Sequence, residues 1–176
     1  MKKQLLHSGW QLTTVGKNDT IPATVPGSVY NDLLNAGRME DPYWRDNEMK
    51  ALALMDEDYR YNTTFDVNAD VLNSERVLLR CEGLDTIADI VLNGEKIASV
   101  CNMHRTWEFD VKDSLKTTGN TLEIVFHSPT KYIKEQDKIC HAGGSEDAMV
   151  GFPNLRKAHC MFGWDWGPRL PDAGIW

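Results

Sequence analysis

Short β-like runs, some mainly apolar and some alternating between apolar and polar positions, dominate the chain from its middle onward. Turn-forming residues separate the runs, and this arrangement is typical of an antiparallel β-sandwich or barrel. Asn93-Gly94 lies between two runs and predicts a two-residue hairpin turn, because both central residues of such a turn need a positive φ. The expected strands are residues 59–67, 75–82, 87–92, 96–100, 107–111 and 121–126.

Two short segments carry helical spacing instead. The first helix is expected to be capped by Ser28 and to end at Gly37. The second begins at Ser128-Pro129, a cap followed by the residue that the first helical position tolerates best. Residues 145–163 show no regular period, and so long an irregular stretch is usually functional or disordered. The expected apolar faces are Val29, Leu33 and Leu34 in the first helix, and Tyr132, Ile133, Gln136 and Ile139 in the second.

Length and charge exclude several classes of protein. A chain of 176 residues, 41% of them hydrophobic, can close one substantial core, so one domain is expected. With 19 Lys and Arg against 26 Asp and Glu, the net charge of −7 argues against nucleic acid and anionic lipid as partners. No apolar run approaches the roughly 20 residues that a membrane span requires, and residues 4–9 do not form a signal-peptide core.

The cysteines are too widely spaced for a zinc knuckle or a redox dithiol. We expect reduced, mostly buried thiols, without a metal or a cofactor. Disulfides remain an alternative, as does a metal site that combines cysteines with their neighbouring histidines. The residues concerned are Cys81, Cys101, Cys140 and Cys160, with His104, His141 and His159.

Residues 162–169 concentrate aromatic and acidic chemistry in one short segment. Trp164 and Trp166 flank Asp165, and Pro168 and Arg169 follow. Aromatic rings can pack on the C–H faces of a sugar, and a carboxylate can accept hydrogen bonds from neighbouring hydroxyls. The segment therefore suits a carbohydrate. The alternative is a pair of core tryptophans, with Asp165 bound to Arg169 or to backbone amides.

Other polar segments carry weaker indications. Asn102 to Arg105 form a loop tip that could line a cleft, or simply a solvated connection. Residues 41–48 form an aromatic and polar loop that we expect to be a packed surface segment. No Gly-x-Ser-x-Gly motif and no phosphate-binding loop is present, so neither a serine hydrolase triad nor a nucleotide site is expected.

Motifs spread along nearly the whole chain resemble the amino-terminal domain of the β-mannosidases of glycoside hydrolase family 2. Leu-Asn-Gly is shared across that family, whereas Trp-Asp-Trp-Gly-Pro-Arg and Val-Pro-Gly-Ser are specific to its mannosidase branch. The motifs are residues 23–29, 32–34, 41–43, 82–86, 91–95, 102–105, 109–111, 162–170 and 173–176.

The resemblance implies an all-β, galactose-binding-like jelly-roll β-sandwich with one or two short helices. It implies that residues 1–176 are one such domain, stopping before its last strand. Immunoglobulin-like domains and a (β/α)₈ barrel would follow, and the barrel would hold both catalytic glutamates. No residue of this chain is then catalytic, and the chain alone is expected to be inactive. The complete enzyme would cleave terminal β-mannose from a β-mannoside or manno-oligosaccharide.

The resemblance also assigns roles to single residues. Asp165 would accept hydrogen bonds from mannose hydroxyls remote from the scissile bond, Trp164 would form a wall, and Asn102 is a weaker match near the same opening. Trp166 and Arg169 would support the loop.

Other hypotheses remain open at this point. The chain could be a freestanding carbohydrate-binding module, a mainly architectural domain, or the equivalent domain of a β-galactosidase or β-glucuronidase. The compartment would be the cytoplasm, or the periplasm if an export signal has been removed.

Overall fold

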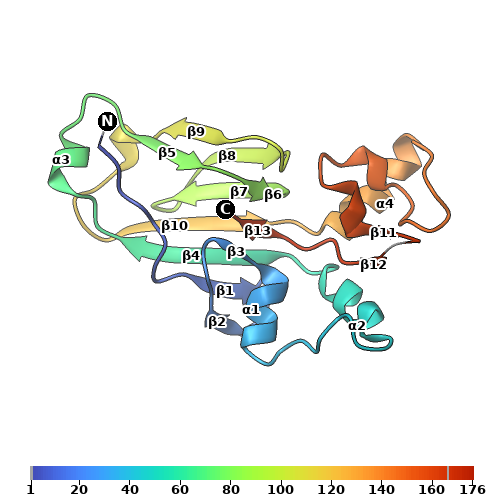
Figure 1. The fold of residues 1–176 in the computed structure, drawn as a ribbon. Coiled ribbons are helices and arrows are strands. Elements are labelled where there is room, and N and C mark those ends of the chain that lie inside the picture. The colour runs from blue at the N-terminus through green and yellow to red at the C-terminus, as the bar shows by residue number, and fades with distance from the viewer. Residues whose placement is uncertain (1, 166) are drawn as a thin grey trace.

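Antiparallel strands supply most of the regular structure of this computed structural model, which describes residues 2–165 and 167–176 (Figure 1). The main sheet has six strands in the order β2-β1-β4-β10-β7-β8, and all neighbours are antiparallel. These strands are β1 (Gln11–Thr14), β2 (Thr20–Pro22), β4 (Tyr59–Phe65), β7 (Ile87–Leu92), β8 (Glu95–Cys101) and β10 (Asn120–Phe126).

Two small sheets contribute the other side of a shared apolar core. One pairs β5 (Leu78–Cys81) with β9 (Trp107–Asp110), and the other has the order β3-β13-β6. In the core, Ile90 and Ile124 of the main sheet lie in the same buried cluster as Leu84 and Ile175. The fold is therefore the expected galactose-binding-like β-sandwich. The strands of the three-stranded sheet are β3 (Gly27–Ser28), β6 (Leu84–Asp85) and β13 (Gly174–Ile175).

Aromatic packing occupies the centre of this core. The Tyr61 ring is fully buried and meets Trp10 and Phe126 edge to face, with ring centroids 6.4 and 5.9 Å away. Its hydroxyl donates a 2.9 Å hydrogen bond to Oδ2 of Asp32, so the polar end of the ring is also satisfied. Burial of each large apolar side chain in such a core contributes about 1.5–3 kcal/mol.

The strands predicted from alternation are all present, with ends that differ by a few residues. β7 has the predicted bounds, and the Asn93-Gly94 turn joins it to β8. Asn93 has φ 52° and Gly94 has φ 83°, which is the backbone geometry that a two-residue hairpin turn requires.

Both predicted helices are also confirmed. In α1 (Val29–Asn35), Oγ of Ser28 accepts a hydrogen bond from the amide of Asn31. In α4 (Pro129–Ile139), Oγ of Ser128 caps the helix in the same way. The placement of Ile139 on the buried face is wrong, because this residue ends the helix and is 79% exposed.

Two further short helices occur among the described residues, α2 (Asn47–Leu54) and α3 (Ala69–Leu72). The loop expected at residues 41–48 therefore runs into α2. It is also less packed than expected, because Tyr43 and Trp44 are 75% and 62% exposed.

Residues 129–169 form a lobe at one end of the sandwich, drawn in orange and red in Figure 1. The lobe has its own buried apolar cluster, which explains how residues 145–163 are held without a long helix or strand. Its elements are α4, two 3₁₀ turns (Phe152–Asn154 and His159–Met161), β11 (Phe162–Trp164) and β12 (Gly167–Arg169). The buried members of the cluster are Ile133, Ala148, Phe152, Leu155 and Phe162.

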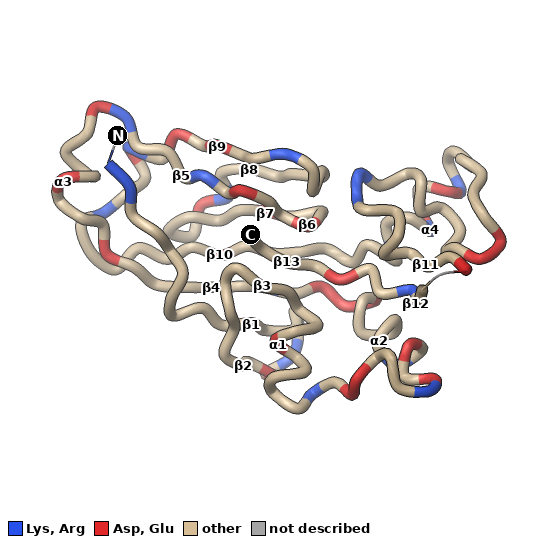
Figure 2. The backbone as a smooth tube through the Cα atoms, in the orientation of Figure 1, with Lys and Arg blue, Asp and Glu red and all other residues tan. Residues whose placement is uncertain are grey.

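The thiols are free, but the expectation that most are buried is wrong. Cys81 lies in the core, whereas Cys101, Cys140 and Cys160 are exposed. Within the described part of the chain, no group of three or more His, Cys, Asp and Glu side chains is arranged to hold a metal ion. No helix among those residues has the length and apolarity to cross a membrane. Figure 2 shows basic and acidic residues interspersed along the backbone.

Candidate functional site

Asp165 lies at the tip of a short hairpin on the lobe. β11 pairs with β12 through Phe162 opposite Arg169 and Trp164 opposite Gly167. This register places Asp165 directly after β11, in the connection between the two strands. Asp165 is exposed, so its carboxyl group is not sealed in the interior. Trp166 lies outside the described residues, and its predicted supporting role stays a prediction.

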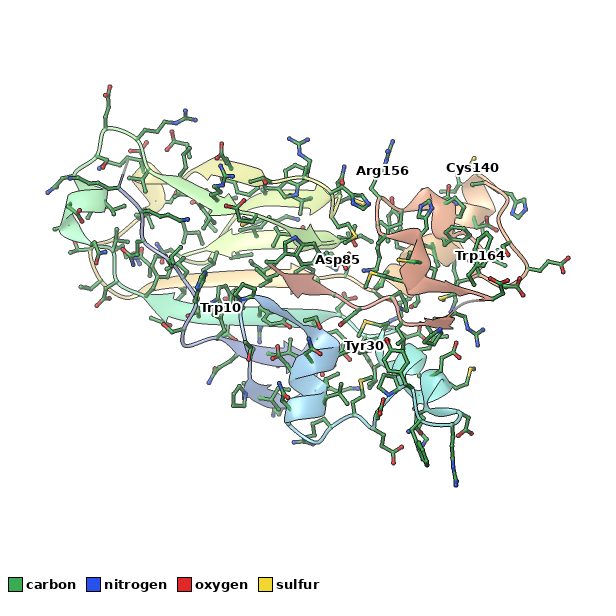
Figure 3. The ribbon with its side chains drawn as sticks, in the orientation of Figure 1. Trp10, Tyr30, Asp85, Cys140, Arg156 and Trp164 are labelled. Carbon is green, nitrogen blue, oxygen red and sulfur yellow. The ribbon has the colours of Figure 1, made fainter. Side chains whose placement is uncertain are left out.

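Trp164 links the hairpin to the interior of the lobe. Its side chain is half-buried and packs against the apolar cluster that contains Phe162 and Phe152. Figure 3 shows Trp164 within the lobe, away from the Trp10 and Tyr30 side chains of the sandwich. The indole is thus fixed on one side and accessible on the other.

Arg169 is bound by a residue of segment 41–48, which the sequence predicts to be a surface loop. Oε1 of Glu48 accepts hydrogen bonds from the backbone amide of Arg169 at 3.0 Å and from its Nε at 2.6 Å. Glu48 stands in the first turn of α2, which lies beside β12 (Figure 1). Burial raises the pKa of Glu48, but the hydrogen bonds and charge of Arg169 outweigh that effect and lower the pKa overall.

Gly163 makes room for the stem of Arg169. A Cβ atom at position 163 would lie 2.4 Å from Cγ of Arg169, and the glycine has φ +86°. Both the close approach and the backbone angle favour glycine. The arginine stem therefore crosses the hairpin directly over Gly163, on its way to Glu48.

Asn102 lies in the connection between β8 and β9. Its Oδ1 accepts a 2.8 Å hydrogen bond from the amide of His104, within its own turn. The next residue, Met103, donates its amide to the carbonyl of Arg156, so this connection contacts the lobe. Within the described chain, no hydrogen bond joins Asn102 to the β11–β12 hairpin. Its predicted place near the sugar stays a prediction.

A buried ion pair fastens the lobe to the sandwich. Lys157 is 1% exposed, and its Nζ donates to the carboxylate of Asp85 and, at 2.5 Å, to the carbonyl of Asp172. Asp85 lies at the end of the sandwich that faces the lobe (Figure 3). Burial lowers the pKa of Lys157 against the opposing effect of Asp85. Burial also raises the pKa of Asp172 to about 6.

The chain leaves the sandwich for the lobe at His127. Nδ1 of His127 lies 3.1 Å from Oδ2 of Asp58, and Nε2 lies 3.1 Å from Oδ2 of Asp89. Burial lowers the pKa of His127, but the hydrogen bonds and charges of the two carboxylates outweigh it and raise the pKa. Both ring nitrogens can donate at once only in the protonated ring, so this junction favours the imidazolium form.

The candidate segment at residues 162–169 is a local pattern of the sequence, whereas the contacts that hold it are not. Glu48, Lys157 and Asp85 were not singled out. An acidic residue in a first helical turn is common, and a lysine in an irregular stretch is usually exposed. The sequence around Glu48 therefore gives no indication that this residue binds Arg169. For Lys157, the flanking Leu155 and Phe162 are the only hint of burial.

The geometry offers one exposed carboxyl group, beside a half-buried indole, on a braced turn. Such a turn can accept hydrogen bonds from hydroxyl groups and pack against a C–H face. A retaining glycosidase needs two carboxylates that act on the same bond, and the hairpin carries one. The arrangement therefore suits the binding of a polyhydroxylated ligand.

Comparisons with protein families, with curated relatives and with solved structures point to the same group of proteins. The family described as glycosyl hydrolase 2 galactose-binding domain-like matches residues 10–176. The β-mannosidase of Bos taurus is 32% identical over 97% of this chain, and β-mannosidase A of Emericella nidulans is 35% identical over 95% of it. The crystal structure of a β-D-mannosidase from Dictyoglomus thermophilum covers 97% of the chain with 38% identity and a TM-score of 0.92.

The matched region is a minor part of each of these relatives. The chain spans 20% of the bovine protein, 18% of the Emericella protein and 21% of the Dictyoglomus chain. The similarity thus concerns one domain of proteins that contain several times as many residues.

Proposed function

The chain belongs to the glycosyl hydrolase 2 galactose-binding domain-like family, and from this premise we propose that it is the non-catalytic N-terminal domain of an exo-acting β-mannosidase. Its task is to place an acidic hairpin tip at the pocket for a terminal β-mannose. The observation that carries the proposal is the exposed Asp165 at the hairpin tip, directly after the anchored Trp164.

Asp165 is assigned to bind hydroxyl groups of the mannose that are remote from the scissile bond. A hydrogen bond to a charged group is worth about 1.5–3 kcal/mol, which is enough to orient a sugar. It cannot replace the two carboxylates of a retaining glycosidase. Those carboxylates belong to the barrel of the complete enzyme, and the chain by itself does not hydrolyse a mannoside.

Supporting roles go to the neighbouring residues. Trp164 forms a wall of the pocket, and Arg169 and Trp166 brace the turn. Asn102 binds the sugar near the same opening. The partners are the end of a β-mannoside or manno-oligosaccharide and the downstream immunoglobulin-like and barrel domains.

Replacement of Asp165 in the complete protein tests this function. The Asp165→Ala variant is expected to lower kcat/KM for an aryl β-mannoside by about tenfold or more, because the sugar loses a charged hydrogen-bond acceptor. Glu146→Ala is the matched control, since Glu146 is an exposed acidic residue of the same lobe and lies outside the hairpin. An unchanged kcat/KM in the Asp165 variant would remove this residue from the sugar site.

A further inference from the structure

The tip of the β11–β12 hairpin needs an external support. The two strands have three residues each, and their register contains two residue pairs. An isolated two-stranded hairpin is at best marginally stable in water. The position of Asp165 therefore depends on contacts that the hairpin makes with other elements.

Strand β11 of the hairpin is held by other residues of the lobe. Phe162 is fully buried in the lobe cluster, and its carbonyl accepts a 3.0 Å hydrogen bond from the amide of Met149. Trp164 packs against the same cluster. These contacts fix β11 and the indole without any help from α2.

The other strand is held by α2. Oε1 of Glu48 accepts two hydrogen bonds from Arg169, one from the backbone amide at 3.0 Å and one from Nε at 2.6 Å. Nη2 of Arg169 also lies 3.5 Å from the sulfur of Met49, the residue after Glu48. The arginine stem in turn covers Gly163 on the opposite strand. Glu48 therefore constrains the backbone and the side chain of the same hairpin residue.

The helix that carries Glu48 is itself fastened to the sandwich core. The hydroxyl of Tyr30 donates to the carbonyl of Ala51 at 2.7 Å, and that of Tyr59 donates to the carbonyl of Leu54 at 2.9 Å. Ala51 is 1% exposed. Glu48 thus connects the hairpin to a rigid part of the molecule rather than to a mobile surface segment.

We propose that Glu48 is a positioning residue for the sugar site, acting through Arg169 to fix where the hairpin presents the carboxyl group of Asp165. This inference rests on the proposed function of Asp165. Glu48 need not touch the sugar. The Glu48 and Arg169 side chains are 27% and 38% exposed, and ion pairs of such exposure contribute little to global stability. The effect of Glu48 is therefore expected in the activity rather than in the unfolding midpoint.

A double-mutant cycle in the complete protein tests whether Glu48 acts through Asp165 or independently of it. Glu48→Ala is expected to lower kcat/KM for an aryl β-mannoside by about tenfold, because a displacement of about 1 Å at a binding group is sufficient for losses of this size. In the Asp165→Ala background, the same substitution should cost less than about twofold, since the group that Glu48 positions is gone. Glu48→Gln keeps an acceptor oxygen and should retain most of the activity.

The control is a second acid that pairs with α2. Glu40 binds Lys50 at 2.6 Å, and both side chains are at least 65% exposed. Glu40→Ala should leave kcat/KM unchanged. The unfolding midpoints of all variants should lie close to that of the wild type, which excludes a loss of folded protein.

The outcomes distinguish the two proposals. If Asp165→Ala lowers kcat/KM but Glu48→Ala does not, or if the two losses multiply, Glu48 has no positioning role and the proposed function stands. If Asp165→Ala itself has no effect, the proposed function fails and the positioning role fails with it.

Discussion

At the scale of single residues, Lys157 shows how a charge can be used to join two parts of a fold. Its ammonium group has been removed from water and given one carboxylate and one carbonyl oxygen as partners. Removal of one member of a buried pair leaves the other charge without compensation, and this costs more than the pair contributes while intact.

The Lys157→Met variant is therefore expected to destabilise the folded state by about 3–5 kcal/mol, measured by urea unfolding. Lys138→Met is the matched control, because Lys138 forms an ion pair with Glu135 in which both side chains are at least 66% exposed. That variant should change stability by no more than about 0.5 kcal/mol. If both variants lose the same free energy of unfolding, the Asp85 carboxylate does not depend on Lys157 for compensation of its charge.

Residue identity points to the candidate segment at residues 162–169, but not to the contacts that hold it. Asp165 could be singled out because a carboxylate between two tryptophans is a local pattern. The partners of Arg169 and Lys157 lie 121 and 72 positions away in the sequence. No local pattern contains such a pairing. It arises only when the sandwich brings α2 and β6 against the lobe.

At the scale of elements, the start of α4 depends on a charged cluster. His127 precedes the Ser128 cap, and its ring lies between Asp58 and Asp89. The pKa of Asp89 is lowered to about 2, since the hydrogen bonds from Lys96, Ser99 and His127 outweigh the effect of burial. The cluster thus keeps its carboxylate charged over the whole range in which the histidine titrates.

The raised pKa of His127 predicts a dependence of stability on pH. A group whose pKa is higher in the folded state than the usual value of about 6.5 stabilises the fold fully below that value. The contribution is lost as the pH rises through the folded pKa. The wild type should therefore lose stability relative to a His127→Gln variant as the pH rises from about 6.5 through the folded pKa.

Urea unfolding at several pH values measures this difference. His141→Gln is the matched control, because the His141 ring is 73% exposed and pairs with Asp137 within a single turn. A stability difference between wild type and His127→Gln that does not vary with pH would contradict the account of this junction. The control should follow the wild type throughout.

The elements with a strong internal pattern were the predictable ones. The Asn93-Gly94 turn after β7 and the caps of α1 and α4 each carry their own physical reason. Along β10, inward and outward positions alternate. Strands of two or three residues, such as β6, β11 and β13, have no room for a period and exist because a neighbour pairs with them. α2 was missed since its apolar residues follow no clear stripe and its first turn is polar.

At the scale of the whole molecule, the sandwich acts as a platform that holds a lobe at one end. The buried Lys157 pair, the His127 junction and the Glu48 contact join lobe and sandwich at separate places. The lobe carries the indole, while α2 of the sandwich constrains the outer strand of the hairpin. The proposed purpose of this whole arrangement is the placement of one carboxyl group beside a sugar.

The most direct test of that claim measures the contact between Asp165 and the sugar itself. Wild type and Asp165→Ala in the complete protein would be compared on an aryl β-mannoside and on deoxy analogues that each lack one hydroxyl remote from the scissile bond. If Asp165 binds one of these hydroxyls, the substitution should cost about tenfold in kcat/KM on the parent substrate and almost nothing on the analogue without that hydroxyl. The same loss on every analogue and on the parent would contradict the account.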